Sequence, residues 1–399
     1  MDFTLPPEHD DLRMRVRSFI NDEVLPLEAD RANFNEFENI RTDILEGVRV
    51  KARAAGLWAP QMPKELGGLG LPMAGQAPFY EEANRSIFGP PALNCSAPDD
   101  GNMRLLSMVA SKAQQDRWLM PIIRGEVRSC FVMTEPHPGG GSDPQMIRTT
   151  AKKSGDKWVI HGHKWFSSGA LLAEHFILVA RTSDDPRKGL TAFLFHRDDP
   201  GWEIVRRISI LSPEEHGGVG ELKFDGLEIP DENRLMEIGD GLKLCQIRLG
   251  PARLTHCMRW LGLAKRSMEI AHDYVETREG FGIKLIDRES VQLKFGRIAH
   301  DIQIGRLLVM HAAWKLDRGD YARQEVSMAK VHVADTLHRA ADEAIQLCGA
   351  KGFSKDTVLE WIYRYARAAR LVDGASEVHN MVLAKGYGAK KYDFWSWGV

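Results

Sequence analysis

Asp373 has the residue type and the setting of a candidate catalytic base. It follows a stretch of helical periodicity that ends near Val372, and Gly374 comes directly after it. A carboxylate at a helix terminus, if shielded from water, has a raised pKa and can take a proton from a substrate. The same Asp-Gly pair is also typical of a helix end followed by a turn. The residues alone leave both interpretations open.

A glycine-rich stretch at residues 133–143 reads Met-Thr-Glu-Pro-His-Pro-Gly-Gly-Gly-Ser-Asp and follows an expected strand at 130–133. Glycines let backbone N–H groups approach an anion closely, and Ser142 adds a hydroxyl donor. A cradle for a phosphate or pyrophosphate and a flexible Gly-Pro turn are both consistent with these residues. The stretch matches neither a Walker A loop nor the dinucleotide-binding fingerprint.

Two adjacent aromatic residues, Trp165 and Phe166, stand beside two hydroxyl residues in Gly-His-Lys-Trp-Phe-Ser-Ser-Gly at 162–169. Such a group can stack on a planar ring and form hydrogen bonds to its edge. Core aromatics at the end of a strand would give the same pattern.

Thr-Arg-Glu-Gly-Phe-Gly at 277–282 ends a long helical pattern. Arg278 could contact a phosphate and Phe281 could stack on a ring. A basic residue in the last turn of a helix is also an ordinary feature, because it complements the helix dipole. His161 and His163 share one face of an expected strand, and we interpret them as structural because no metal-ligand cluster accompanies them.

The elements that must position these residues fall into three regions. Helical periodicity covers the chain up to about residue 123. Short strands then follow, at 157–161, 176–180, 191–195 and 221–224, with Asp225-Gly226 as a turn between extended pieces. Strands without long helices between them favour an antiparallel barrel or sandwich. Long helices are expected after Pro230, near 252–279, 288–317, 320–348, 356–370 and 374–387, which suggests a bundle.

The predicted fold class is therefore mixed α and β, in three domains. These are an N-terminal helical domain at 1–127, a middle antiparallel β-barrel domain at 128–236 and a C-terminal four-helix-type bundle at 237–399.

Composition narrows the class of protein. The net charge of −2 over 399 residues gives no general attraction to nucleic acid or to an anionic membrane. Five widely spaced cysteines favour a reducing compartment over a disulfide framework or a zinc site. The acidic N-terminal residues resemble neither a secretory signal nor a transit peptide. We therefore expect a cytoplasmic protein without a membrane span.

Taken in order, the motifs resemble the acyl-CoA dehydrogenase family over essentially the whole chain. The residues that carry the resemblance are Thr134 to Asp143, Lys164 to Gly169, Arg278 with Phe281-Gly282, and Gln346 to Gly352. Within the family the chain is most similar to the branch of human members ten and eleven, through Arg248 to Arg259 and Asp373 to His379. Those human members also carry a kinase-like domain, for which this chain has no room.

The resemblance implies that FAD is the cofactor. It assigns FAD contacts to Met133, Thr134, Ser142, Trp165, Phe166, Ser167, Arg278, Phe281, Gln292, Gln346, Gly349 and Gly374. In the family Arg278 and Gln346 would serve the FAD of a neighbouring subunit. The resemblance therefore implies a homodimer or a homotetramer.

The resemblance also implies a reaction, the oxidation of an acyl-CoA to the trans-2-enoyl-CoA, as in fatty acid β-oxidation. Asp373 would take the α-proton while the β-hydride passes to flavin N5, and electron-transfer flavoprotein would receive the electrons. Some family members place the base at the position of Ala252, but alanine cannot take a proton. Arg253 matches a family arginine that supports the loop carrying the base.

One departure from the family keeps another function open, and two others leave the backbone contacts of His137 to Gly141 and the contacts near the FAD adenosine unassigned. Aspartate is one methylene shorter than the usual glutamate, and nitroalkane oxidase uses aspartate here, so a flavin oxidase is an alternative. The glycine loop is two residues longer than the common form, and Ala375 and Glu377 replace the usual Thr and Gln. A flavin- and nucleic-acid-binding homologue is a further alternative; its basic face would be Arg364, Arg367, Arg370, Lys385, Lys390 and Lys391.

Overall fold

The structure is a computed structural model that describes residues 4–214 and 217–388. The chain divides into two compact units. We call them the helical unit, from residues 1–33, 71–90 and 253–399, and the sheet unit, from residues 34–70 and 91–252. Because both units are assembled from separate segments of the chain, the three domain limits drawn from the sequence stay a prediction.

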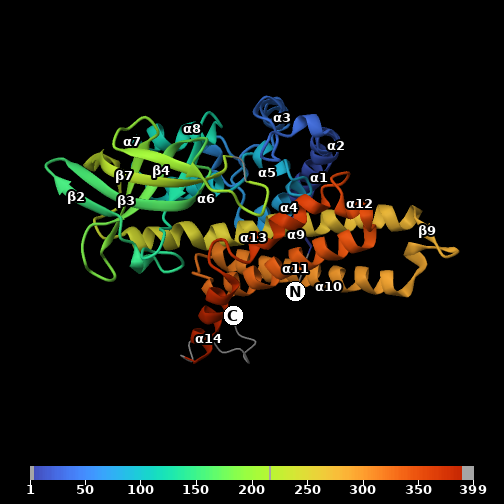
Figure 1. The fold of residues 1–399 in the computed structure, drawn as a ribbon. Coiled ribbons are helices and arrows are strands. Elements are labelled where there is room, and N and C mark those ends of the chain that lie inside the picture. Colours follow the sequence, from blue (N-terminus) through green and yellow to red (C-terminus); the bar gives the residue numbers. More distant parts are fainter. Residues whose placement is uncertain (1–3, 215–216, 389–399) are drawn as a thin grey trace. The chain divides into compact units, whose positions relative to one another are not determined.

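The sheet unit is built on eight strands hydrogen-bonded in the order β6-β7-β3-β2-β4-β5-β8, with β1 beside β4 (Figure 1). The strands are β1 (Arg128–Val132), β2 (Thr150–Ser154), β3 (Lys157–Ser168), β4 (Ala173–Arg181), β5 (Leu190–His196), β6 (Trp202–Arg207), β7 (Val219–Pro230) and β8 (Arg234–Leu235). Most pairings are antiparallel, as expected, while β1 and β2 each pair with β4 in parallel. Each strand expected from the sequence lies within or overlaps one of these strands.

An aromatic cluster fills the core of the sheet. The rings of Phe176 on β4 and Phe195 on β5 stack with centroids 4.7 Å apart. Trp202 meets Phe195 edge-on at 5.1 Å, and Phe224 on β7 completes the group. Aromatic pairs in these arrangements add about 0.5–1.5 kcal/mol beyond the burial of their surface. The cluster joins β4, β5, β6 and β7, and β7 pairs in turn with β3, which carries Trp165, Phe166 and Ser167.

The prediction of a turn at Asp225-Gly226 is wrong. Both residues lie inside strand β7, opposite β3, where the register shifts between Ile160 and His161. Gly226 has a φ of 84°, and it is the extra residue of a β-bulge. An Asp-Gly pair suits a bulge as well as a hairpin turn, because both need a positive φ. Pairing with β3, which is distant in sequence, decides between them.

The sheet unit contains two helices of moderate length, α3 (Thr42–Ala54) and α6 (Asp99–Val109). It also contains the short helices α7 (Lys112–Gln114) and α8 (Met120–Ile123), and the short helix α5 spans Gly89–Ala92. Ser111 caps α7 with a capping box, because its side chain accepts from the backbone N–H of Gln114. In the same unit, Asp99 accepts hydrogen bonds from the backbone and side chain of Ser129 on β1. These bonds fix α6 against β1.

The helical unit is a bundle of long helices joined by a few short ones. They are α1 (Pro7–Phe19), α2 (Leu25–Ala29), α4 (Met73–Ala83), α10 (Glu289–Asp317), α11 (Arg323–Cys348), α12 (Ala350–Phe353), α13 (Leu359–Ala369) and α14 (Ser376–Gly388), together with part of α9 (Gly241–Thr277). Helix α11 packs against α10, α13 and α14 (Figure 1). Helix α9 begins at Gly241, not near 252 as expected, because it continues through Pro251.

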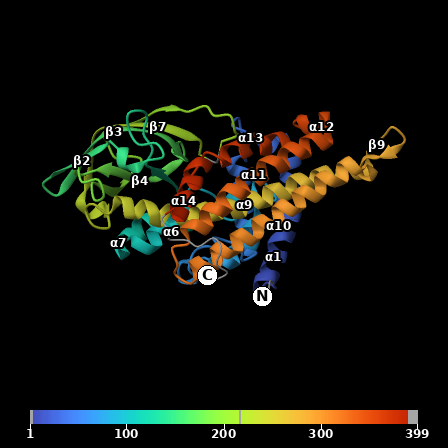
Figure 2. The same ribbon diagram turned by 90° about the horizontal axis from the view of Figure 1, so that it is seen from below.

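Two glycines let the long helices approach one another. A Cβ on Gly262 of α9 would lie 2.3 Å from the carbonyl oxygen of Glu81 on α4. A Cβ on Gly305 of α10 would lie 2.9 Å from Leu261 Cδ2 and 3.1 Å from Val333 Cγ2. Any larger residue at Gly262 would meet backbone, so α4 and α9 depend on this glycine. Beyond the ends of α9 and α10, the chain continues as a small hairpin (Figure 2).

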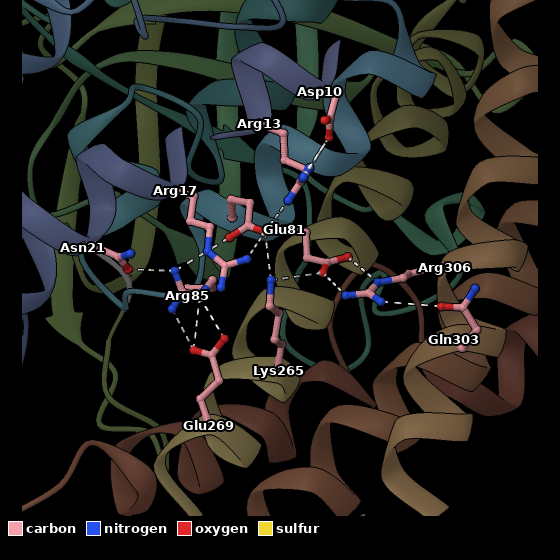
Figure 3. Close-up of polar contacts among 11 residues, drawn as sticks. Asp10, Arg13, Arg17, Asn21, Glu81, Arg85, Lys265, Glu269, Gln303 and Arg306 are labelled. Atoms are coloured by element: carbon pink, nitrogen blue, oxygen red, sulfur yellow. Dashed lines mark hydrogen bonds and ion pairs between the residues drawn. The ribbon is translucent and has the colours of Figure 1, made fainter. Parts of the chain in front are cut away.

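A network of charged side chains joins α1, α4, α9 and α10 (Figure 3). At its centre is Glu82, whose side chain is 3% exposed and lies 2.8 Å from Lys265 Nζ and 3.5 Å from Arg13. Its neighbours pair in turn: Arg85 contacts Glu269 at 2.9 Å, and Arg306 contacts Glu81. Because Glu82 faces several cations, its charge is compensated although it is buried.

Replacing Glu82 by Gln is expected to destabilise the helical unit. Removing one partner of a buried ion pair leaves an uncompensated charge and costs about 3–5 kcal/mol. Thermal denaturation should show a fall in Tm of several degrees relative to the parent. The matched control is Asp116→Asn, which breaks a solvent-exposed pair with Lys112 and should change the stability by less than about 1 kcal/mol. Equal shifts for the two variants would contradict the role given to Glu82.

Two kinds of feature are absent from the described residues. None of the helices within 4–214 and 217–388 is both long and apolar enough to cross a membrane. The same residues contain no group of three or more His, Cys, Asp or Glu side chains that could hold a metal ion. His161 and His163 instead face the carboxylates of Asp225 and Glu221. The five cysteines are free and buried.

Candidate active site

Asp373 and Gly374 form a tight loop between α13 and α14. Both have left-handed backbone conformations, with φ of 52° and 96°. A positive φ is uncommon outside glycine, although aspartate adopts it more readily than most residues. The side chain of Asp373 is 18% exposed. The loop is therefore a partly enclosed segment that carries a carboxylate.

Three side chains from three helices hold the backbone of this loop. Arg253 Nε on α9 donates to the carbonyl oxygen of Asp373 at 2.8 Å. His379 on α14 places Nε2 at 3.3 Å from the same oxygen. Lys330 Nζ on α11 donates to the carbonyl oxygen of Gly374 at 2.8 Å. These bonds fix the backbone of the loop and so the position of the Asp373 Cα.

The two titratable groups of this clamp are strongly perturbed. Burial lowers the pKa of Lys330 to about 8, although Cys257 and Asp373 act in the opposite direction. Burial, together with the nearby cations Arg253 and Lys330, lowers the pKa of His379 to about 4. His379 is therefore neutral at pH 7. Its Nε2–H donates to Asp373, and its Nδ1 accepts from the hydroxyl of Ser327 at 3.0 Å.

The depressed pKa of His379 predicts that acid loosens the loop. The unfolded chain protonates this histidine near pH 6.5, and the folded chain only near pH 4. The stabilisation is complete above pH 6.5 and is lost as the pH falls toward 4, by about 2 kcal/mol at pH 5. His379→Gln should therefore show a smaller loss of Tm between pH 7.5 and pH 5 than the parent protein. Parallel Tm profiles for the two proteins would contradict the assignment.

Met133 and Thr134 lie directly beside β3 in the sheet unit. Lys164 Nζ donates to the carbonyl oxygen of Met133 at 2.7 Å, and the backbone N–H of Trp165 donates to Thr134 at 3.0 Å. The structure thus brings together two motifs that are about thirty residues apart in the sequence. Trp165 and Phe166 follow at once, with ring centroids 5.0 Å apart.

A buried ion pair anchors this arrangement. Lys164 is fully buried and lies 3.0 Å from Glu135 Oε1, whose side chain is 3% exposed. The same carboxylate accepts from the backbone N–H groups of Arg148 and Thr149. Burial lowers the pKa of Lys164 to about 8. For Glu135, burial acts to raise the pKa, but Lys164 and the hydrogen bonds outweigh it and hold the pKa below its ordinary value.

The three glycines of the stretch at residues 133–143 have different roles. A Cβ on Gly139 would lie 2.2 Å from Glu135 Oε2, so this glycine makes room for the ion pair. Gly140 closes the loop by accepting from the backbone N–H of Glu135 at 2.8 Å. Gly141 has open space around it and Ser142 is exposed. Only the last part of the stretch is therefore free to face a ligand.

The residues after Lys164 fit a planar, polar group such as a flavin. The hydroxyl of Ser167 is buried yet has no hydrogen-bond partner among the described residues. An orphaned buried hydroxyl is costly unless a ligand or water satisfies it. Phe166 is 49% exposed and has a φ of 48°, which is unusual for an aromatic residue. An aromatic face beside an unused hydroxyl suits stacking on a ring and bonding to its edge.

Arg278 and Phe281 lie on the small hairpin after α9, formed by β9 (Glu279–Gly280) and β10 (Ile283–Lys284). Phe281 and Gly282 occupy its turn with φ of 54° and 84°. Positive φ at both central positions is the type I′ pattern, in which phenylalanine is unusual. Phe281 is fully exposed at the tip. An exposed aromatic side chain held in a strained turn suggests a contact outside this chain.

The other expected cofactor residues lie within the helical unit. Gln292, near the start of α10, donates to the carbonyl oxygen of Ile286 at 3.1 Å. Gln346 lies in the last turn of α11, and Gly349 follows that helix with a φ of 57°. Of the residues predicted for this unit, the structure brings Arg253, Asp373 and Gly374 into direct contact.

The basic segment expected for a nucleic-acid-binding homologue is partly neutralised. Arg364 pairs with Glu360 on the same helix at 2.7 Å, and Arg370 lies 3.2 Å from Asp335. Lys390 and Lys391 lie outside the described residues.

Sequence reasoning missed several residues that the structure places at these sites. They are His256, Ser327, Lys330 and His379 around Asp373, and Glu135 and Lys164 beneath the glycine loop. The alternation of β3 offered a signal for one of them. Lys164 falls on the same strand face as Trp158 and Ile160, so period-2 counting places it in the core.

Family models match three consecutive parts of the chain. The N-terminal domain of acyl-CoA dehydrogenase matches residues 6–126, the middle domain 130–227 and the C-terminal domain 239–388. Probable acyl-CoA dehydrogenase FadE2 of Mycobacterium tuberculosis is 35% identical over 96% of each chain. Acyl-CoA dehydrogenase family member 10 of mouse is 34% identical, and family member 11 of human is 33% identical. This chain spans 37% of the mouse protein and 49% of the human protein.

Solved structures agree with these relatives. A structure described as that of an acyl-CoA dehydrogenase of Mycobacterium abscessus has a TM-score of 0.90, with 34% identity over 98% of this chain and 100% of that one. The structure of glutaryl-coenzyme A dehydrogenase in complex with glutaryl-CoA has a TM-score of 0.85, with 28% identity over 98% of this chain and 97% of that one. A prolyl acyl carrier protein oxidase, 23% identical with a TM-score of 0.81, shares the fold. The expected fold class is confirmed. The chain belongs to the acyl-CoA dehydrogenase family, whose members are FAD-dependent oxidoreductases.

Proposed function

We propose that this protein oxidises an acyl-CoA thioester to the trans-2-enoyl-CoA, with Asp373 as the base that removes the α-proton. The observation that carries the proposal is the clamped loop. Arg253, Lys330 and His379 all act on the backbone at Asp373 and Gly374, and they fix the loop from which the carboxylate of Asp373 projects.

The residues around Asp373 fit proton removal. The reaction takes a proton from Cα and a hydride from Cβ, and the electron pair of the Cα–H bond becomes the new double bond. Arg253 and Lys330 place positive charge beside the loop, while the carboxylate itself stays half-enclosed. Because the Asp373 side chain is only 18% exposed, little water can reach the carboxylate, although it is not fully buried. Aspartate is one methylene shorter than glutamate, so the loop must bring its backbone closer to the substrate for the carboxylate to contact the α-hydrogen.

FAD, when bound, supplies the acceptor for the hydride. In our proposal Met133, Thr134, Trp165, Phe166 and Ser167 contact its ring system, and Ser142 bonds its pyrophosphate. The orphaned hydroxyl of Ser167 and the exposed face of Phe166 support this placement. Arg278, Phe281, Gln292, Gln346, Gly349 and Gly374 complete the proposed set, with Arg278, Phe281 and Gln346 serving a neighbouring subunit of a homodimer or homotetramer.

We further propose electron-transfer flavoprotein as the electron acceptor and a cytoplasmic role in fatty acid β-oxidation. The experiment that tests the function combines product analysis with the choice of acceptor. Purified protein with FAD is incubated with acyl-CoAs and either an artificial electron acceptor or oxygen. We expect the trans-2-enoyl-CoA by mass spectrometry with the acceptor, and little peroxide with oxygen. Peroxide release from nitroalkanes, without an enoyl-CoA product, would instead establish the oxidase alternative.

A further inference from the structure

Arg248 is a buried cation of the sheet unit that the proposed reaction does not use. It lies near the start of α9, and only 5% of the residue is exposed. Its Nε donates to the amide oxygen of Asn102 at 3.2 Å, and its Nη2 donates to the carbonyl oxygen of Pro98 at 3.3 Å. Both acceptors are neutral. Because a guanidinium keeps its charge in proteins, the sheet unit encloses a full positive charge at this point.

The charge of Arg248 has no carboxylate partner. None of the residues within 4–214 and 217–388 forms an ion pair with it. Of the two buried carboxylates at the start of α6, Asp99 pairs with Arg128 at 2.5 Å, and Asp100 accepts from the backbone N–H of Gly101 at 2.7 Å. Buried charges in proteins are normally paired, because an enclosed charge loses its hydration. The burial of Arg248 therefore calls for an anion from outside the chain.

The surroundings of the guanidinium leave it open to such an anion. Two of its five N–H groups donate to Asn102 and Pro98, so N–H groups on Nη1 and Nη2 remain. Nη1 has no hydrogen-bond partner among the described residues, yet it is not one of the unpaired atoms that protein encloses completely. Gly101 makes room for the group, since a Cβ there would lie 2.9 Å from Arg248 Cζ. A ligand can thus contact a guanidinium that the protein holds in place.

The guanidinium also contacts the strand that leads to the proposed flavin site. Its Cζ lies 5.2 Å from the centroid of the Phe131 ring on β1, which is a cation–π contact. Met133 and Thr134, which we propose to contact the flavin, follow two and three residues after Phe131. An acyl chain that gives a hydride to the flavin lies beside this segment. The acyl chain is therefore a natural carrier of the missing anion.

We propose that Arg248 binds a carboxylate at the far end of the acyl chain, so that the substrates are dicarboxylic acyl-CoAs. The inference rests on the proposed function, because it assumes an acyl-CoA beside the flavin. A carboxylate fits the open edge of the guanidinium, since two N–H groups, one on Nη1 and one on Nη2, match its two oxygens. A chain that ends in a methyl group leaves the buried charge unpaired, so the site discriminates between the two kinds of chain.

Matched pairs of acyl-CoAs test the inference. At each chain length, one acyl-CoA ends in a carboxylate and the other in a methyl group, and bleaching of the flavin is followed without oxygen. In the parent protein the carboxylate form should react faster at one or more lengths. Arg248→Met should lower this preference by about 10–100-fold, as for lost hydrogen bonds to a charged group. Arg248→Lys should keep part of it, because lysine retains the charge without the planar pair of donors.

Two further variants separate the site from general stability. Arg124→Met is the matched control, because Arg124 is half-exposed and pairs with Glu126; its preference should stay within about twofold of the parent. Gly101→Ala keeps Arg248 but displaces its guanidinium, and alanine is favourable within α6. This variant should also lose most of the preference while it retains FAD. If Arg248→Met purifies without FAD, the result for Gly101→Ala decides.

Three results would overturn the inference. The first is a parent protein that reacts faster with the methyl form at every chain length. The second is an equal loss for both forms in Arg248→Met, because the arginine would then serve a part that both share, such as the CoA phosphates. The third is a Gly101→Ala variant that loses FAD but keeps the preference, which would assign Arg248 to the FAD phosphates.

A binding measurement distinguishes this inference from the proposed function. Calorimetry with FAD-loaded Asp373→Asn measures the affinity for each acyl-CoA without turnover. The carboxylate form should bind more tightly, and adding Arg248→Met should remove the difference. A carboxylate preference in binding, combined with no bleaching of the parent by any acyl-CoA, would refute the proposed function and leave the Arg248 site standing. Bleaching by acyl-CoAs with equal affinities for the two forms would overturn the inference alone.

Discussion

Asp373→Asn is expected to retain FAD and to lose acyl-CoA oxidation by about 10²–10⁴-fold or more, the usual effect of removing a positioned general base. Asparagine has nearly the size of aspartate, and the carbonyl oxygen that accepts from Arg253 and His379 belongs to the backbone. The clamp therefore survives while the proton acceptor is lost. The measurement is the rate of flavin bleaching by acyl-CoA without oxygen, together with the FAD content of the purified variant.

The matched control for this variant is Asp335→Asn. Asp335 lies on α11, its side chain is 41% exposed, and its ion-pair partner is Arg370. It makes the same chemical change on a surface of the helical unit, so bleaching should stay within about twofold of the parent. Asp373→Asn with parental bleaching would remove Asp373 from the reaction.

Lys164→Met is expected to destabilise the sheet unit by about 3–5 kcal/mol and to release FAD. Lys164 is fully buried, so its removal leaves Glu135 as a buried carboxylate without its cation. It also removes the donor to the carbonyl oxygen of Met133. The segment that we propose to contact the flavin thereby loses its tie to β3. Denaturant unfolding and the ratio of flavin to protein absorbance report the two effects separately.

Two comparison variants make this prediction specific. Lys157→Met lies on the same strand and breaks an exposed pair with Glu228, so it should change stability by less than about 1 kcal/mol. Lys164→Met combined with Glu135→Met removes both charges, and replacing a buried pair by apolar residues is often neutral. The double variant should therefore regain stability relative to Lys164→Met. A single Lys164→Met that matches Lys157→Met in stability and FAD content would contradict the role of the pair.

Local patterns predicted the elements better than their limits. The helical regions and the strands were found, since their periodicity is local. The bulge at Gly226 was read as a turn, because its sequence suits both and only pairing with β3 distinguishes them. Helix α9 was predicted to begin near residue 252, because Gly250-Pro251 resembles a helix break. In the structure the helix continues through Pro251. At Gly226 the pairing with a distant strand outweighs the local signal.

In the candidate site, too, local sequence predicted some residues, while others depend on contacts between distant segments. Asp373 and Arg253 were identified through the family resemblance, and the structure brings them into contact. His256 has a local signal, because it follows Arg253 at helical spacing, but its distance from Asp373 depends on the packing of the bundle. Lys330 and His379 lie on two further helices, so no local pattern connects them to the loop. Glu135 joins the Thr134 motif in sequence, yet its partner Lys164 depends on how the loop meets β3.

The measurement that tests the central claim most directly is a titration of the purified flavoprotein with acyl-CoAs of varied chain length, in the absence of oxygen. The visible absorption band of the flavin reports electron transfer from substrate. The account predicts that one subset of acyl-CoAs bleaches this band in the parent protein, and that the same subset leaves it unchanged in Asp373→Asn on the same timescale. A yellow protein that no acyl-CoA bleaches would contradict it.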